Sequence, residues 1–200
     1  MAMSLQETSV LRSRLYPLQI DQNPQDMQLY QTIRYEFIKA NEGYTLNAYR
    51  DTTGHVTVGI GFNMDAAGAQ QVWDRIFSSN LSFNRVYNSN DELSDEDVRN
   101  LFQYSIQQRL DQLKRIYAQS WLKLRANERL GIEDSYYNCP ALVNNQTRFY
   151  QYINQYVNTR EMDYLEQAIN EIKNDSNPSD NSGIQNRRNV EAEMLSAPVS

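Results

Sequence analysis

Residues 42–61 read EGYTLNAYRDTTGHVTVGIG, and this segment marks a change from helical to strand-like sequence. Before it, between Asp26 and about Asn41, apolar side chains recur every three or four residues, which predicts an amphipathic helix. Within it, two β-type runs, LNAYRD and HVTVGIGF, flank residues 52–54, whose residue types favour a hairpin turn. We therefore expect a helix followed directly by a small sheet.

Outward from this segment, the remaining chain is mainly helical in pattern. Helical spacing of apolar residues predicts helices over 67–77, from Ser94 to about Tyr117, and over 121–130, 149–157, 164–172 and 184–195. A tyrosine-rich junction is expected over 136–141, and the segment NDSNPSDNSG is expected to be a loop. The expected fold is α+β and mainly helical, with a small β-hairpin lobe and a larger helical lobe.

The first part of the chain differs in character. Residues 1–24 are polar and contain Pro17 and Pro24, so an extended N-terminal arm is expected there, which could serve as an attachment segment. Residues 25–200 are then the main domain. Since the chain has 200 residues, of which 40% are hydrophobic and 22% charged, it suits one domain or two lobes that share a core.

The charge balance and the hydropathy exclude several classes of partner. A formal net charge of −6 offers no general attraction to nucleic acid phosphates, so a nucleic acid partner is not expected. No apolar run approaches the ~20 residues needed to span a bilayer, so membrane insertion is not expected. The first residues have neither the basic nor the apolar region of a signal peptide, so we expect another agent to carry the chain out of the cytoplasm.

Cys139 is the only cysteine and His55 the only histidine. An intramolecular disulfide is therefore excluded, no Cys/His spacing suits zinc, and neither a metal nor an organic cofactor is expected. His55 is predicted to face solvent in the hairpin turn. Trp73 and Trp121 fall on apolar helical faces and are predicted to pack in the core.

Three polar residues of the opening segment suggest chemistry. Glu42 ends the expected helix, Asp51 lies on the first strand and Thr57 on the second, so a hairpin folded back beside the helix would bring them to one cleft. Paired carboxylates at such a junction suit glycoside hydrolysis, in which one acid protonates the leaving oxygen and the other activates water. The alternative is structural: Glu42 only ends a helix and Asp51 only starts a turn.

The same segment resembles the phage lysozyme family, glycoside hydrolase family 24. That family's motif is Glu-Gly, then Tyr-x-Asp, then Gly-x-x-Thr-x-Gly-x-Gly, and the spacing here is the same. The resemblance implies a lysozyme-like fold and hydrolysis, with inversion, of the β-1,4 bond between N-acetylmuramic acid and N-acetylglucosamine. It also implies that Glu42 is the general acid, that Asp51 assists the attacking water and that Thr57 positions it.

Substrate contacts are expected around this centre. A proton donor needs a partly apolar cleft, for which Tyr44, Tyr49 and Phe62 are the expected walls. The strand glycines, Gly61 among them, are expected to let the backbone approach the glycan or pack tightly. Gly61 and Phe62 are therefore predicted substrate-binding residues.

A second similarity lies near the C-terminus. Residues 183–191, GIQNRRNVE, resemble the family's closing helix, from which a basic residue reaches the catalytic glutamate. The resemblance implies that Arg187 or Arg188 orients Glu42 at the substrate site. The alternative is that these arginines form a solvated charged face or pair with Glu191 or Glu193 of their own helix.

The expected activity is that of a peptidoglycan-degrading muramidase, with glycan strands as its partner. The acidic balance, the absence of an export signal and the arm favour an enzyme carried in the phage virion, which would also bind other virion proteins through the arm. A free endolysin of the host cytoplasm is the second setting, and in both the action falls in the periplasm or cell wall. The alternatives are a catalytically inactive lysozyme-fold adaptor of the virion and a bacterial effector with a muramidase domain.

Overall fold

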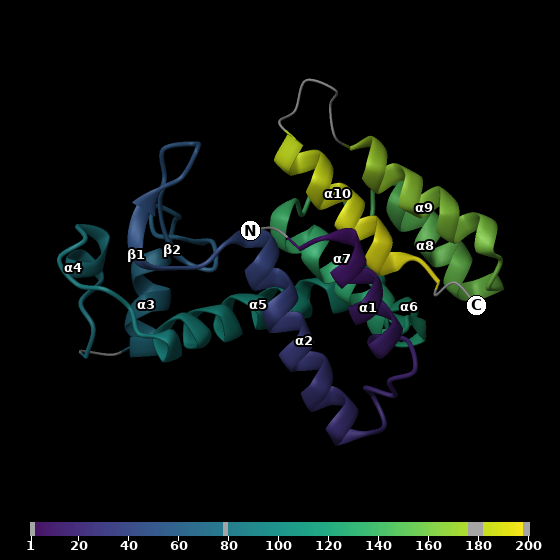
Figure 1. Ribbon diagram of the computed structural model, residues 1–200, viewed down its shortest axis with the longest axis horizontal. Coiled ribbons are helices and arrows are strands. Elements are labelled where there is room, and N and C mark those ends of the chain that lie inside the picture. Colours follow the sequence, from purple (N-terminus) through teal and green to yellow (C-terminus); the bar gives the residue numbers. More distant parts are fainter. Residues whose placement is uncertain (1–2, 78–79, 176–181, 198–200) are drawn as a thin grey trace. The chain divides into compact units, whose positions relative to one another are not determined.

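The computed structural model describes residues 3–77, 80–175 and 182–197 (Figure 1). Within them the chain forms ten helices and one three-stranded antiparallel sheet, which confirms the expected mainly helical α+β class. The helices are α1 Leu5–Leu15, α2 Pro24–Glu42, α3 Ala69–Phe77, α4 Phe83–Tyr87, α5 Asp95–Tyr117, α6 Gln119–Lys123, α7 Ala126–Asn138, α8 Arg148–Thr159, α9 Met162–Asn174 and α10 Ser182–Leu195. The strands are β1 Thr45–Arg50, β2 Val56–Gly59 and β3 Phe62–Asn63.

The chain divides into two compact units, and each is described by itself. The first unit is Ile38–Gln108, and the second is Ala2–Phe37 together with Arg109–Ser200. The helices α2 and α5 therefore contribute residues to both units. The boundary expected after residue 24 stays a prediction.

The sheet of the first unit has the order β1-β2-β3, with both pairs antiparallel. Tyr49 lies opposite Thr57, and Thr57 lies opposite Asn63, so β2 is the central strand. The turn between β1 and β2 is closed by the Asp51 amide, which donates to the His55 carbonyl at 2.9 Å. Gly54 has φ +89°, a conformation that a residue with a Cβ rarely adopts, so the turn depends on glycine there.

The core of the first unit is centred on Trp73, which is fully buried on α3. Its indole Nε1–H donates to the Leu81 carbonyl at 2.8 Å. The rings of Phe77 and Phe83 have their centroids 4.7 Å and 5.6 Å from the Trp73 ring. The buried apolar residues of β2 and α5 that complete this unit are Val56, Val58, Val98, Leu101, Phe102 and Ile106. The prediction that Trp73 packs in the core is confirmed.

The second unit is built around α7, from which nearly every side chain is buried. The helix α10 packs against α7, α9 and α1, and α8 packs against α9, as Figure 1 shows. Gly131 permits the close approach of α10, because a Cβ at this position would lie 2.7 Å from Leu195 Cγ. Trp121 on α6 is also buried, as predicted.

The expectation of an extended arm over residues 1–24 is wrong for residues 5–15, which form α1. Ser4 and Glu7 form a capping box: the Glu7 amide donates to Ser4 Oγ at 3.2 Å and the Ser4 amide to Glu7 Oε2 at 2.9 Å. The polar face of α1 is anchored by Arg12, whose Nη1 lies 3.0 Å from Glu193 Oε1, while Leu15 is fully buried. Capping and one ion pair therefore stabilise a helix that the polar composition of residues 1–24 did not indicate.

Three further local expectations need correction. The short helix α4 was not expected, and the single helix expected over 121–130 is divided, because Leu124 has extended backbone between α6 and α7. The expected junction over 136–141 is helical as far as Asn138, since Pro140 only prevents the helix from continuing through Cys139. Residues 176–181, most of the expected loop NDSNPSDNSG, lie outside the described residues.

No helix in the described part of the chain combines the length and the apolar character that crossing a bilayer would require.

Candidate active site

The three residues predicted to be catalytic all lie in the first unit. Glu42 is the last residue of α2, Asp51 follows β1 directly, and Thr57 is on the central strand β2. Gly43, with φ +88°, follows Glu42, and its amide donates to the Lys39 carbonyl at 3.1 Å. This glycine ends the helix and turns the chain into β1 within a few residues.

Asp51 uses its two carboxyl oxygens differently. Oδ1 accepts hydrogen bonds from the Thr53 amide and hydroxyl, both at 2.8 Å, and from the His55 amide at 3.0 Å. Oδ2 accepts a longer hydrogen bond from the Thr57 hydroxyl at 3.4 Å. The Thr53 hydroxyl, followed by the two amides, lowers the pKa of Asp51, so this carboxylate stays ionised at neutral pH.

Tyr49 lies on β1, between Glu42 and Asp51 in the chain. It is directly opposite Thr57 in the strand register, and the residue is 45% exposed. Partial burial, then the negative charges of Asp51 and Glu42, raise the pKa of the Tyr49 phenol. Nearby negative charge favours the protonated form of a phenol.

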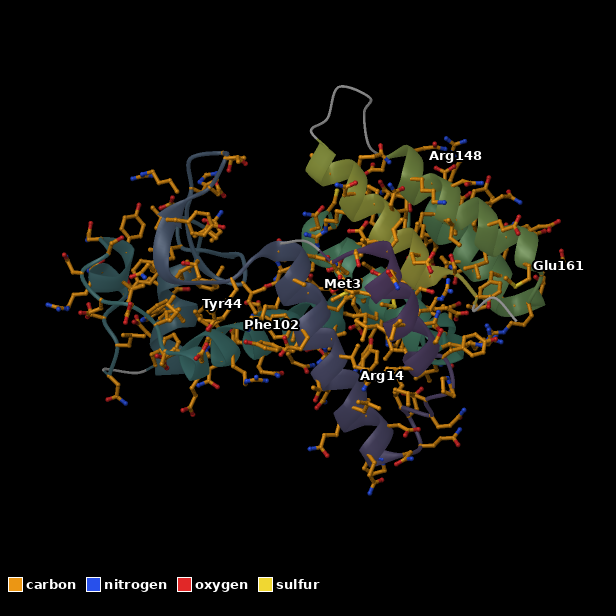
Figure 2. The ribbon with its side chains drawn as sticks, in the orientation of Figure 1. Met3, Arg14, Tyr44, Phe102, Arg148 and Glu161 are labelled. Carbon is orange, nitrogen blue, oxygen red and sulfur yellow. The ribbon has the colours of Figure 1, made fainter. Side chains whose placement is uncertain are left out.

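Glu42 is half-buried, and its Oε1 atom is fully buried. The residue two positions on, Tyr44, ties the start of the sheet to α5, because its hydroxyl donates to the Asp95 carboxylate. The Lys39 ammonium lies 4.1 Å from the centroid of the Tyr44 ring. Figure 2 labels Tyr44 where the chain leaves α2. The segment after Glu42 is thus held by two contacts of Tyr44, one with Asp95 and one with Lys39.

Gly61 and Phe62 lie at the turn into β3. Gly61 has φ +71°, which suits glycine, and Phe62 is half-buried with its ring centroid 6.3 Å from that of Trp73. Phe62 thus contributes to the aromatic core of the unit. The predicted contact of these two residues with substrate stays a prediction.

Asp65 is a second carboxylate that organises the hairpin, and the sequence reasoning missed it. Its Oδ2 accepts the Val56 amide at 2.7 Å and its Oδ1 accepts the Tyr87 hydroxyl at 2.7 Å. The Val56 amide, ahead of the Tyr87 hydroxyl, lowers the pKa of Asp65. The available signal was Asn63-x-Asp65 directly after a strand, because the Asp65 amide donates to Asn63 Oδ1 at 2.8 Å in a side-chain-capped turn.

His55 lies beside Asp65 at the outer side of the hairpin. Its side chain is 52% exposed, and its Nδ1 is 3.7 Å from Asp65 Oδ2. The prediction of a solvent-facing turn histidine is confirmed. In the described ranges no group of three or more histidine, cysteine or acidic side chains is placed to hold a metal ion.

Arg187 and Arg188 are buried on α10 in the second unit. Glu191 accepts from both: its Oε1 is 3.0 Å from Arg187 Nε, and its Oε2 is 2.8 Å from Arg188 Nη1. Arg187 also pairs with Asp134 at 3.2 Å, and Arg188 with Asp175 at 3.1 Å. The structure thus shows the alternative expected for both arginines, pairing with Glu191, and an orienting contact with Glu42 stays a prediction.

The first unit therefore offers an ionised carboxylate with a hydroxyl beside it, a half-buried glutamate and an exposed phenol influenced by both acids. This set can perform general acid–base chemistry on a polar bond and can bind a ligand with mixed apolar and hydroxylated faces. No protein-family model matches the chain, and a search of curated proteins finds no match either.

Proposed function

We propose that this protein is a muramidase, which hydrolyses the β-1,4 bond between N-acetylmuramic acid and N-acetylglucosamine in peptidoglycan glycan strands and has the lysozyme-like fold of the family that residues 42–61 resemble. One observation carries the proposal: the Thr57 hydroxyl donates to Asp51 Oδ2 at 3.4 Å on the hairpin that begins directly after Glu42. Glycoside hydrolysis with inversion uses two carboxyl groups, one as the acid and one as the base.

In the proposed reaction, Glu42 donates its proton to the glycosidic oxygen as the bond from that oxygen to the anomeric carbon breaks. A water molecule attacks the anomeric carbon from the opposite face, and Asp51 accepts the proton that this water loses. Asp51 suits the basic role because its lowered pKa keeps it ionised. Thr57, whose hydroxyl lies beside Asp51 Oδ2, orients the water.

The alternative function, an inactive lysozyme-fold adaptor, also has a specific observation in its favour. Asp51 Oδ1 accepts three hydrogen bonds within its own turn, and a purely structural aspartate would make the same contacts. We favour the enzyme because closing the turn does not require the Thr57 hydroxyl beside Asp51 Oδ2.

The biological setting is a separate part of the proposal. The virion setting gains no support from an extended arm, since residues 5–15 form a helix packed on α10 and α7, whereas the net charge of −6 still favours it. Mass spectrometry of purified particles distinguishes the settings. Detection of the chain in washed virions supports the virion enzyme, and detection only in lysates supports the endolysin.

The test of activity uses purified protein on isolated bacterial sacculi, with release of reducing ends as the readout. Glu42→Gln should lower the rate by at least about 100-fold, because it removes the proton donor. The matched control is Glu92→Gln, which changes an exposed carboxylate of the same unit and should leave the rate unchanged. Nuclear magnetic resonance of the first-formed anomer tests inversion.

The outcomes separate the two functions. A wild-type protein that releases reducing ends, with Glu42→Gln inactive at unchanged melting temperature, supports the muramidase. A folded wild type that binds sacculi but releases no reducing ends, like the variant, supports the adaptor.

A further inference from the structure

Tyr49 stands apart from the other aromatic residues of the first unit. It is exposed to 45%, and among the described residues of Ile38–Gln108 it is the one large hydrophobic side chain in the exposed class. A single exposed ring is common on protein surfaces and has no meaning by itself. The neighbours of this ring are what give it significance.

The strand register places the Tyr49 ring beside the proposed catalytic groups. Residues directly opposite in an antiparallel pair project to the same face, so Tyr49 shares a face with Thr57. Side chains two positions apart along a strand also share a face, which adds Asp51, whose amide continues the pairing to His55. The intervening Arg50 projects to the other face, where its Nη1 donates to the Gly54 carbonyl at 2.9 Å.

We propose that Tyr49 is a substrate-positioning residue whose exposed ring is the platform on which a sugar ring of the glycan rests, beside Asp51 and Thr57. The inference rests on the proposed function and deepens it by assigning a subsite. The apolar C–H face of a pyranose packs on an aromatic ring, and the hydroxyl groups at its edge need polar partners nearby. The Tyr49 ring supplies the apolar face and the Asp51 carboxylate beside it the polar partner, while the buried Thr57 donates its hydroxyl to Asp51 Oδ2.

The phenol hydroxyl adds a donor to this platform. Because partial burial and the charges of Asp51 and Glu42 disfavour its ionisation, the raised pKa of Tyr49 keeps the hydroxyl protonated over the whole range in which the enzyme would work. A protonated phenol can donate a hydrogen bond to a sugar oxygen or to the water near Asp51. The ring is expected to contribute more than the hydroxyl, because only the ring provides the stacking area.

Kinetics on solubilised glycan strands test this assignment. Tyr49→Ala should raise KM by roughly 10-fold, the loss expected for one aromatic contact, with kcat changed by less than about threefold. Tyr49→Phe keeps the ring and should restore KM to within about threefold of wild type. The control is Tyr104→Ala on α5, a half-buried tyrosine of the same unit whose hydroxyl accepts from Arg75 at 2.8 Å, and it should leave KM unchanged.

A binding measurement provides a readout that does not need turnover. In the Glu42→Gln background, fluorescence titration with a chitin tetrasaccharide should show weaker binding when Tyr49→Ala is added, again by roughly 10-fold. Addition of Tyr104→Ala to the same background should have no effect. If the ring is purely structural, Tyr49→Ala should instead have a lower melting temperature, with KM and glycan affinity unchanged.

Failure of the inference and failure of the proposed function give different results. If the wild type is active and Tyr49→Ala changes neither KM nor glycan affinity, the platform is wrong and the muramidase proposal is unaffected. A wild type without activity that still binds the tetrasaccharide through Tyr49 overturns the muramidase and supports the platform. A wild type that neither cleaves nor binds glycan overturns both.

Discussion

The two units satisfy their carboxylates by different means. In the first unit, Asp51 and Asp65 accept hydrogen bonds from backbone amides and from hydroxyl groups of their own hairpin and of α4. In the second unit, carboxylates are buried together with arginine guanidinium groups. These buried carboxylates are Glu128, Glu133, Asp134 and Glu191.

The contrast indicates where charge is structural and where it is available for chemistry. Arginine partners neutralise the charge of a buried carboxylate. Removal of that carboxylate leaves a buried cation without a counter-charge. Glu133 illustrates the cost of burial: desolvation raises its pKa even though Arg34 Nη1 lies 3.6 Å away. A carboxylate held by amides at a turn remains near the surface and stays ionised, so it can meet a substrate. The proposed catalytic role therefore belongs to the first unit.

The largest expected effect is on the second unit. Glu191→Gln should destabilise the protein by about 3 kcal/mol, because Glu191 is the common partner of the buried Arg187 and Arg188. Urea unfolding measures this change. The control, Glu166→Gln on the exposed face of α9, should stay within about 0.5 kcal/mol of wild type. Equal stability of the two variants would contradict the structural role of these buried charges.

A smaller effect is expected at alkaline pH, again in the second unit. Burial and the neighbouring Glu128 carboxylate raise the pKa of Tyr156 from 10.0 to about 12, and its hydroxyl donates to Glu128 Oε1 at 2.7 Å. Since the unfolded chain ionises first, this contribution is complete below pH 10 and is lost as pH rises to about 12. The total loss should be roughly 2 kcal/mol.

Tyr156→Phe provides the comparison for the alkaline prediction. It removes the hydrogen bond to Glu128, so the variant should be less stable than wild type by about 1 kcal/mol at neutral pH. The stability gap should then close and reverse between pH 10 and 12, because only the wild type carries the Tyr156 phenol, whose loss of roughly 2 kcal/mol exceeds the initial gap of about 1 kcal/mol. Thermal unfolding across that range measures it, and a gap independent of pH would argue against the assignment.

The smallest effect is expected in the hairpin at acid pH. The pKa values of Asp65 and Asp51 are lowered, so their stabilising hydrogen bonds persist above the ordinary carboxyl range near 3.9 and are lost as pH falls through the folded-state values. Hydrogen exchange of the Val56 amide, which donates to Asp65 at 2.7 Å, reports this locally. Asp65→Asn should accelerate that exchange at neutral pH, whereas Asp163→Asn on α9 should not. Unchanged exchange in Asp65→Asn would show that the contact contributes nothing to the hairpin.

Local patterns predicted much of the first unit. The helix before Gly43, the first strand and the turn at residues 52–54 lie close to their expected positions, because each depends on neighbouring residues. The second expected strand, HVTVGIGF, is instead divided into β2 and β3 by a turn in which Gly59 and Gly61 have positive φ. Asp65 was missed because its partners, Val56 and Tyr87, come from other elements. A contact between different elements produces no regular spacing of residue types from which it could be predicted.

The second unit was predicted less well for the same reason. The helix α1 looked like a polar arm, since Arg12 and Thr8 carry no apolar signal, yet both are buried. Its stabilisation comes from Glu193, which follows about 180 residues later in the chain. The arginines of α10 could equally have faced solvent until Asp134 of α7 was seen beside Arg187.

The sequence by itself determined the mainly helical class, the hairpin and the clustering of Glu42, Asp51 and Thr57 within a short span, because short-range spacing and turn chemistry specify these features. Only the tertiary structure decided which charges are buried, that α1 packs against α10, and that the Tyr49 ring shares a strand face with Asp51 and Thr57. Burial and ion pairing depend on residues that are distant along the chain. Local sequence patterns do not show which distant residue will contact a given side chain.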